Sequence, residues 1–141
     1  MKPSCVCFTL VLIARPVVSC DDILATDAWV REPPPVAKVV AGYLRLENTG
    51  DHPVAINRIE SDCCTRIALH ETTLDGDRVR MTRTEALELA PLEAAVLTPG
   101  GAHLMLIAPI EPIRHGDVVP IEFSCAGGGT FRVDFDVMKN R

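Results

Sequence analysis

The C-terminal part of the chain alternates apolar and polar residues, and this pattern constrains the fold more than any other. Apolar side chains occupy every second position in residues 119–123 and again in residues 131–137, with three glycines at 127–129 between the two runs. Because successive side chains of a strand point to opposite faces, each run predicts a strand with one buried face. The glycine turn between them predicts an antiparallel pair.

Short segments of strand character recur through the rest of the chain, and glycine, proline or Asn/Asp turns separate them. They cover residues 27–31, 39–48, 54–60, 66–70, 78–81, 94–98 and 103–106. Residues 32–35, Glu-Pro-Pro-Pro, predict an extended loop because proline lacks a donor and fixes φ. A helical period is almost absent, so we expect an all-β sandwich or small barrel.

The size and charge of the chain restrict its function. A chain of 141 residues with net charge −5 predicts one domain, which we place at residues 21–141, with a core that needs no metal to form. The absence of a Lys/Arg cluster argues against nucleic acid as a partner. No Gly-x-Ser-x-Gly or His-Glu-x-x-His pattern occurs, so we expect a monomeric binding protein and no enzyme.

Residues 1–20 have the features of a targeting segment. Lys2 precedes an apolar run at residues 6–14 that is too short for a permanent membrane helix, which predicts export to the periplasm. Residues 17–20, Val-Val-Ser-Cys, resemble a bacterial lipobox, which would place a lipid tether on Cys20. Ordinary cleavage after Ser19 or Cys20 fits about as well and would leave the domain free, so both routes stay open.

Four side chains form a candidate metal site. His103 and Met105 lie two apart in an apolar run, so they share one face of a strand. His70 ends another strand-like run, and the Asp-Gly turn at residues 75–76 folds the chain back and brings Met81 near His70. We therefore predict one site built from His70, Met81, His103 and Met105.

The donor types indicate which metal this site would hold. Two imidazoles and two thioethers make a soft, neutral set that suits Cu(I), whereas zinc prefers thiolates or carboxylates and calcium requires oxygen. A methionine more often fills a gap in the core, and a histidine on a strand is more often structural. The spacing of these four residues favours the metal site. His52 and His115 lie in turns, so we take both as surface residues.

The spacing H-x10-M-x21-H-x-M resembles the signature of the PCuAC family of periplasmic Cu(I)-binding domains. The likeness covers residues 27–137 and includes the segments 28–31, 41–48, 69–71 and 99–106. It implies a cupredoxin-like Greek-key β-sandwich that carries Cu(I) to the CuA centre of cytochrome c oxidase, with oxidase subunit II or an assembly factor as acceptor. The family pattern assigns the ligand roles to His70, Met81, His103 and Met105. Glu71 departs from it, since some members carry a methionine there.

The cysteines raise a separate question. Two of the six lie inside the targeting segment and Cys20 lies at its edge, which leaves Cys63, Cys64 and Cys125 in the domain. In an oxidising compartment we expect a disulfide from Cys125 to Cys63 or Cys64, with a slight preference for Cys64. The adjacent pair is not a feature of the PCuAC pattern. A thiolate that assists copper is the alternative.

Three functions remain in view. The first is a Cu(I) carrier, the second a protein that sequesters copper without delivering it, and the third an exported interaction module whose Met/His face packs against a partner. A blue-copper electron carrier is excluded because no cysteine lies between His103 and Met105, and Cys125 belongs to a separate hairpin.

Overall fold

The alternating C-terminal segments form the predicted antiparallel pair. β9 (Val118–Cys125) pairs with β10 (Thr130–Met138), and Phe123 lies opposite Phe131. In β9 every second side chain from Val119 to Cys125 is buried. The period of two in the sequence therefore describes the inner and outer faces of this pair.

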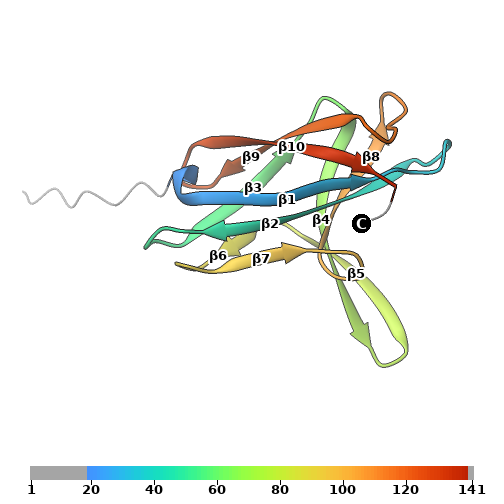
Figure 1. The fold of residues 1–141 in the computed structure, drawn as a ribbon. Helices are drawn as coiled ribbons and strands as arrows, with labels where there is room; N and C mark the ends of the chain where they lie inside the picture. Colours follow the sequence, from blue (N-terminus) through green and yellow to red (C-terminus); the bar gives the residue numbers. More distant parts are fainter. Residues whose placement is uncertain (1–18, 140–141) are drawn as a thin grey trace, which may run out of the picture.

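The computed structural model describes residues 19–139 and shows the all-β architecture that the sequence predicts (Figure 1). The remaining elements are η1 (Cys20–Asp22), β1 (Ile23–Arg31), β2 (Val39–Asn48), β3 (Val54–Glu60), β4 (Cys64–Asp75), β5 (Arg78–Thr84), β6 (Leu87–Leu89), β7 (Ala94–Leu97) and β8 (His103–Pro109). Among the described residues, no helix is long and apolar enough to cross a membrane. The predicted targeting segment lies outside these residues, except for Ser19 and Cys20.

The strands are hydrogen-bonded in the order β5-β4-β8-β2-β1-β10-β9-β3-β6, with β7 also paired to β2. β1 connects the two halves of this order, because it runs antiparallel to β2 and parallel to β10. The halves face each other as the two layers of a sandwich (Figure 1). β8 and β4 are neighbours in one layer, and they carry three of the four predicted metal ligands.

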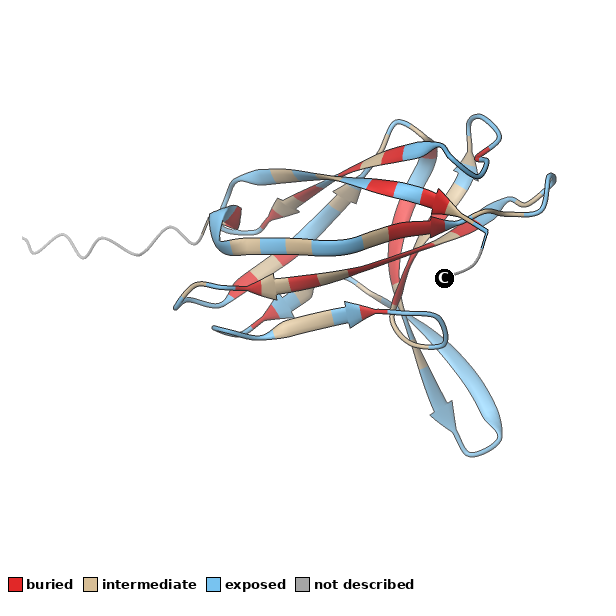
Figure 2. Ribbon diagram, viewed as in Figure 1, coloured by how far each residue is buried: buried red, intermediate tan, exposed pale blue. Residues whose placement is uncertain are grey.

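The core lies between the layers, where Figure 2 shows buried residues along the facing strands. Its largest fully buried side chains include Phe123 and Phe135 from one half of the strand order and Leu104 and Leu106 from the other. Since Leu104 and Leu106 point into the core, the alternate positions of β8 point to the outer face. His103 therefore points away from the core, although its side chain is itself buried.

The hairpin of β4 and β5 projects from the body of the sandwich (Figures 1 and 2). A turn at Gly76 and Asp77 joins the strands, and Gly76 adopts φ 63°, a conformation that glycine accepts readily. Leu74 and Val79 lie opposite each other near its tip and are 77% and 64% exposed. The hairpin predicted at residues 75–76 is confirmed, and its outer half packs against little of the domain.

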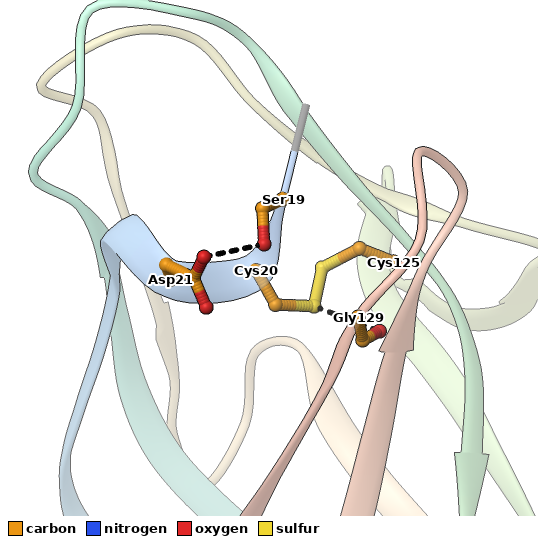
Figure 3. The surroundings of a disulfide bond; sticks show 5 residues. All are labelled: Ser19, Cys20, Asp21, Cys125 and Gly129. Carbon is orange, nitrogen blue, oxygen red and sulfur yellow. Dashed lines mark hydrogen bonds between the residues drawn. A yellow bond between two sulfur atoms is a disulfide. The ribbon is translucent and has the colours of Figure 1, made fainter. Parts of the chain in front are cut away.

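The disulfide of the domain joins Cys20 to Cys125, with a Cα–Cα distance of 5.7 Å (Figure 3). The predicted pairing of Cys125 with Cys63 or Cys64 is wrong, since both of those cysteines are free. Ser61, two residues before Cys63, donates a hydrogen bond to the carbonyl oxygen of Pro120, so the two free cysteines lie near Pro120. Cys125 is five residues farther along the extended strand, about 17 Å away. This distance is far beyond the reach of a disulfide.

The partner of Cys125 comes instead from the N-terminal edge of the domain. Both sulfur-bearing residues are buried, and Cys20 Sγ lies 3.4 Å from the carbonyl oxygen of Gly129 in the β9–β10 turn (Figure 3). Ser19 Oγ donates a hydrogen bond of 2.8 Å to Asp21. The same Cys20 sulfur cannot also carry the thioether-linked lipid of a lipobox.

Candidate metal centre

The strand register brings three predicted ligands onto one outer face. His70 of β4 lies directly opposite His103 of β8, and Met105 lies opposite Ala68. Opposed residues of an antiparallel pair share a face, as do residues two apart along a strand. The two imidazole rings have centroids 6.0 Å apart at an interplanar angle of 60°. His70, His103 and Met105 therefore form one cluster.

His103 is held in one tautomer. Its side chain is buried, and its Nδ1 lies 3.0 Å from the carbonyl oxygen of Gly101 in the turn before β8. A carbonyl oxygen only accepts, so Nδ1 must carry the proton and donate it. The lone pair of the neutral ring is then on Nε2. A hydrogen bond to the other nitrogen is the usual way in which proteins orient a histidine that ligates a metal.

His70 has an unpaired nitrogen. Its Nδ1 is buried and, within residues 19–139, is the single buried side-chain nitrogen or oxygen without a hydrogen-bond partner. Such an atom costs free energy unless a ligand satisfies it. Burial, then the nearby charges of His103, Arg83 and Arg66, lowers the pKa of His70 below its ordinary value. The neutral ring, which is the form that binds metal, is therefore favoured.

Met81 lies on the same face but farther out on the hairpin. It pairs with Thr72, two residues beyond His70 on β4, and it is 58% exposed. Met105 pairs with Ala68, two residues to the other side of His70. The two methionines are thus offset by four residues along β4, about 13 Å. The register gathers the other three residues and leaves Met81 at the rim.

The donors that the register gathers on this face are the imidazoles of His70 and His103 and the thioether of Met105, with the thioether of Met81 at the rim. No group of three or more His, Cys, Asp or Glu side chains that could hold a metal occurs in the described part of the chain. Imidazole and thioether donors fit Cu(I).

The two other histidines are surface residues, as predicted. His52 contacts Asp51 in an exposed turn, and His115 Nδ1 lies 3.1 Å from the carbonyl oxygen of Val137. Neither belongs to the cluster.

A family model described as "Putative lipoprotein LpqE-like" matches residues 23–137. The chain belongs to the LpqE-like family. A curated relative, the putative lipoprotein Lxx21020 of Leifsonia xyli subsp. xyli (strain CTCB07), is 23% identical over 111 residues. That match covers 78% of this LpqE-like chain and 66% of the relative, so the chain spans a little under two thirds of the relative's length.

Solved structures with the same fold are PCuAC domains. The copper-bound PCuAC domain from PmoF2 matches with a TM-score of 0.71 at 21% identity, over 82% of this chain and 92% of that domain. Cu(I)-DR1885 from Deinococcus radiodurans matches with a TM-score of 0.68 at 27% identity, over 83% of this chain and 78% of the other. The resemblance to PCuAC domains and the predicted cupredoxin-like sandwich are confirmed.

Two aromatic residues border this face of the LpqE-like chain. Trp29 and Tyr43 are opposed across β1 and β2, with ring centroids 4.6 Å apart, and both are buried. Tyr43 lies two residues from Ala41, which is opposite Met105. The rings therefore form a wall beside the cluster. Only the β2–β8 register, which no local pattern reveals, connects them with Met105.

Proposed function

We propose that this chain is an exported Cu(I) chaperone that binds copper through His70, His103, Met105 and Met81. One observation carries the proposal: the unpaired, buried Nδ1 of His70 lies on a sheet face that also holds the fixed ring of His103 and a thioether. Nitrogen and sulfur donors without carboxylate suit a soft monovalent ion. The copper-bound state of the PmoF2 and DR1885 structures supports the same reading.

Met81 would join the site by movement of the hairpin. Thr72 and Leu74 of β4 alternate with polar residues, so they share the face of His70, and Val79 and Met81 lie opposite them. The hairpin thus presents an exposed apolar stripe, Leu74, Val79 and Met81, on the metal side. Bending toward the cluster would bury this stripe and supply the second thioether. Bending away would remove the Met81 thioether from the metal ion.

Release makes delivery possible. A soft ion held by neutral donors at an open sheet face exchanges readily with a stronger set of ligands on an acceptor. We propose that the acceptor is the CuA centre of cytochrome c oxidase, reached through subunit II or an assembly factor. The resemblance of the sequence to the PCuAC family implies this acceptor, and export would place the chain in the compartment where it could meet it. Transfer of copper to an isolated subunit II separates delivery from sequestration, because a sequestering protein would retain its ion.

The test of binding is a Cu(I) titration of the purified chain against a chelator. Met81→Ala combined with Met105→Ala should weaken Cu(I) binding by more than about tenfold, since even groups that only support metal ligands contribute 10–100-fold. Met138→Ala is the matched control, because Met138 ends β10 and lies outside the cluster. An unchanged affinity in the double variant would refute the ligand assignment. If the chain is an interaction module without metal, neither the wild type nor the variants should bind Cu(I).

A further inference from the structure

Cys63 and Cys64 form a second cluster of soft donors, remote from the first. Both thiols are free, although the described part of the chain also contains a disulfide. Cys64 begins β4 opposite Pro109, whereas His70 lies six residues farther along the strand, opposite His103. Six residues of extended strand span about 20 Å. A single metal ion cannot contact both clusters.

A tight turn brings the two thiols together. Neighbouring side chains within a strand point to opposite faces, but Cys63 belongs to the turn that precedes β4. The backbone N–H of Cys63 donates to Ser61 Oγ at 3.2 Å, and that hydroxyl donates to the carbonyl of Pro120 at 2.5 Å. The two cysteines are neighbours in the chain, and the thiol of Cys64 is close enough to change the pKa of Cys63. Cys64 Sγ also lies 3.6 Å from the carbonyl oxygen of Arg66. The turn thus places two free thiols at neighbouring positions.

The surroundings of Cys63 favour a cation. Cys63 is half-buried and lines a cavity of about 440 Å³ whose lining also includes Asp62, Glu111 and Asp117, whereas Cys64 lines a neighbouring cavity. Three negative groups around one opening attract positive ions. They are not arranged to ligate a metal together with the thiols. Their contribution is long-range attraction, and the two sulfurs are the donors.

Cys63 is the more readily ionised of the two thiols. Its interaction with Cys64, with a smaller contribution from Ser61, lowers the pKa of Cys63. The interaction with Cys63, followed by burial, raises the pKa of Cys64. The thiolate is the form of cysteine that binds metals.

We infer that Cys63 and Cys64 form a second Cu(I) site, which holds the ion between two sulfurs and is independent of the His/Met cluster. Cu(I) replaces the proton of each sulfur that is still a thiol when the ion binds, so that protons are released and no electron is transferred. Soft thiolates bind Cu(I) in preference to harder ions. The chain would then carry copper at two separate places along β4.

The experiment is an anaerobic Cu(I) titration of the full exported chain with its Cys20–Cys125 disulfide intact. We expect two equivalents for the wild type and one for Cys63→Ser/Cys64→Ser. Met81→Ala/Met105→Ala should keep the equivalent at the cysteines, with sulfur-to-copper charge-transfer absorption in the ultraviolet. Cys63→Ser alone changes only the half-buried position and leaves the buried Cys64 in place. This single variant should also lose tight binding of the copper equivalent at the cysteines.

Two results would overturn the inference. One is equal copper content in the wild type and the double cysteine variant. The other is a wild type without titratable thiols, which would mean that Cys63 and Cys64 are oxidised to each other. If Met81→Ala/Met105→Ala binds one equivalent of copper fewer than the wild type, the His/Met site is supported whatever the cysteine variants show. The experiment thus tests the cysteine site and the His/Met site separately.

Discussion

At the scale of single residues, His70 and His103 differ although they face each other. His103 donates its Nδ1 proton to Gly101 and is held in place, whereas His70 has a buried nitrogen without a partner. Burial and neighbouring positive charge lower the pKa of His70. Protons therefore compete poorly for this ring, which favours copper binding in mildly acidic surroundings.

Arg83→Gln should raise the pKa of His70 in the copper-free protein. Arg83 lies directly opposite His70 across β4 and β5, and its charge disfavours a second positive charge on the ring. The variant should also release Cu(I) at a higher pH than the wild type, because protonation of His70 then begins earlier during acidification. Histidine ring signals followed by NMR across the pH range measure the pKa directly.

Arg80→Gln is the control for this experiment. Arg80 is on the same strand and, like Arg83, has one surface carboxylate near its side chain, but it lies on the opposite face of the hairpin. It should leave the His70 titration unchanged. Equal shifts in both variants would mean that general surface charge, not the pairing of Arg83 with His70, lowers the pKa.

The same depressed pKa predicts how the stability of the copper-free protein depends on pH. The unfolded chain, with an ordinary imidazole, binds the His70 proton at a higher pH than the folded chain does. The free energy of unfolding should therefore fall as the pH drops from about 6.5 through the folded pKa. Urea unfolding of wild type and His70→Gln measures this slope, and identical slopes between pH 6.5 and pH 5 would contradict the environment described for His70.

Sequence spacing predicted which four residues to consider, because His103 and Met105 are two apart on a strand. It could not predict the tautomer of His103, the unpaired nitrogen of His70 or the role of Arg83. Each of these depends on strand register, which is set by hydrogen bonds between segments distant in the chain.

At the scale of elements, the β4–β5 hairpin carries Met81, so its position would decide whether this thioether reaches the proposed copper site. One of its faces is polar, and the other carries Leu74, Val79 and Met81 beside the cluster. Bending toward the cluster would remove these exposed apolar residues from water, which would stabilise a bent state relative to the extended one. Copper held by Met81 would add to this bias.

Leu74→Ser combined with Val79→Ser should weaken Cu(I) binding although neither residue is a ligand. Partial burial of two apolar side chains is worth roughly 1–2 kcal/mol, so the affinity should fall about tenfold. Thr73→Ser combined with Arg80→Ser, on the polar face, is the matched control and should change little.

Amide hydrogen exchange gives a second measurement of the same movement. Exchange at the hairpin should slow when the wild type binds Cu(I), since a bent hairpin is held by the metal and by the body. Unchanged exchange, together with unchanged affinity in the apolar-face variant, would mean that the hairpin stays extended in the bound state.

Most elements could be predicted from alternation and turn residues. The strands at residues 39–48 and 54–60 have the predicted bounds, and the hairpin turn lies at Gly76. The short η1 could not be foreseen, because it is stabilised by a disulfide and by contacts with the β9–β10 turn. Alternation also does not reveal that β1 lies between β2 and β10.

At the scale of the whole molecule, the Cys20–Cys125 disulfide fastens the start of the domain to the end of β9. It closes a loop with a sequence separation of 105 residues. Its partner could not be predicted, since cysteine count alone leaves connectivity open and Cys20 falls at the predicted cleavage boundary. The sandwich layers themselves follow from the apolar patterns.

Cys20→Ser combined with Cys125→Ser should lower the free energy of unfolding by about 2–4 kcal/mol, because the crosslink restricts the unfolded chain. Cu(I) affinity of the folded protein should stay the same, since the His/Met cluster lies on β4, β5 and β8. Cys63→Ser, which keeps the disulfide, is the control. Urea unfolding measures the stability, and a loss confined to Cys63→Ser would contradict the assigned pairing.

The disulfide also bears on export. A Cys20 sulfur bonded to Cys125 is unavailable for lipid, whereas the family and the curated relative are described as putative lipoproteins. If the disulfide forms in the exported chain, the intact mass of the protein purified from the periplasm should match an unmodified chain with one disulfide. A mass increased by acyl groups would show the lipobox route and require Cys125 to be free.

The most direct measurement is the copper X-ray absorption spectrum of Cys63→Ser/Cys64→Ser loaded with one equivalent of Cu(I). With those thiols removed and Cys20 paired to Cys125, any sulfur bound to the metal must come from methionine. We predict an edge characteristic of Cu(I) and a first shell that contains both imidazole nitrogen and sulfur. A first shell without sulfur, or a protein that binds no copper, would contradict the account.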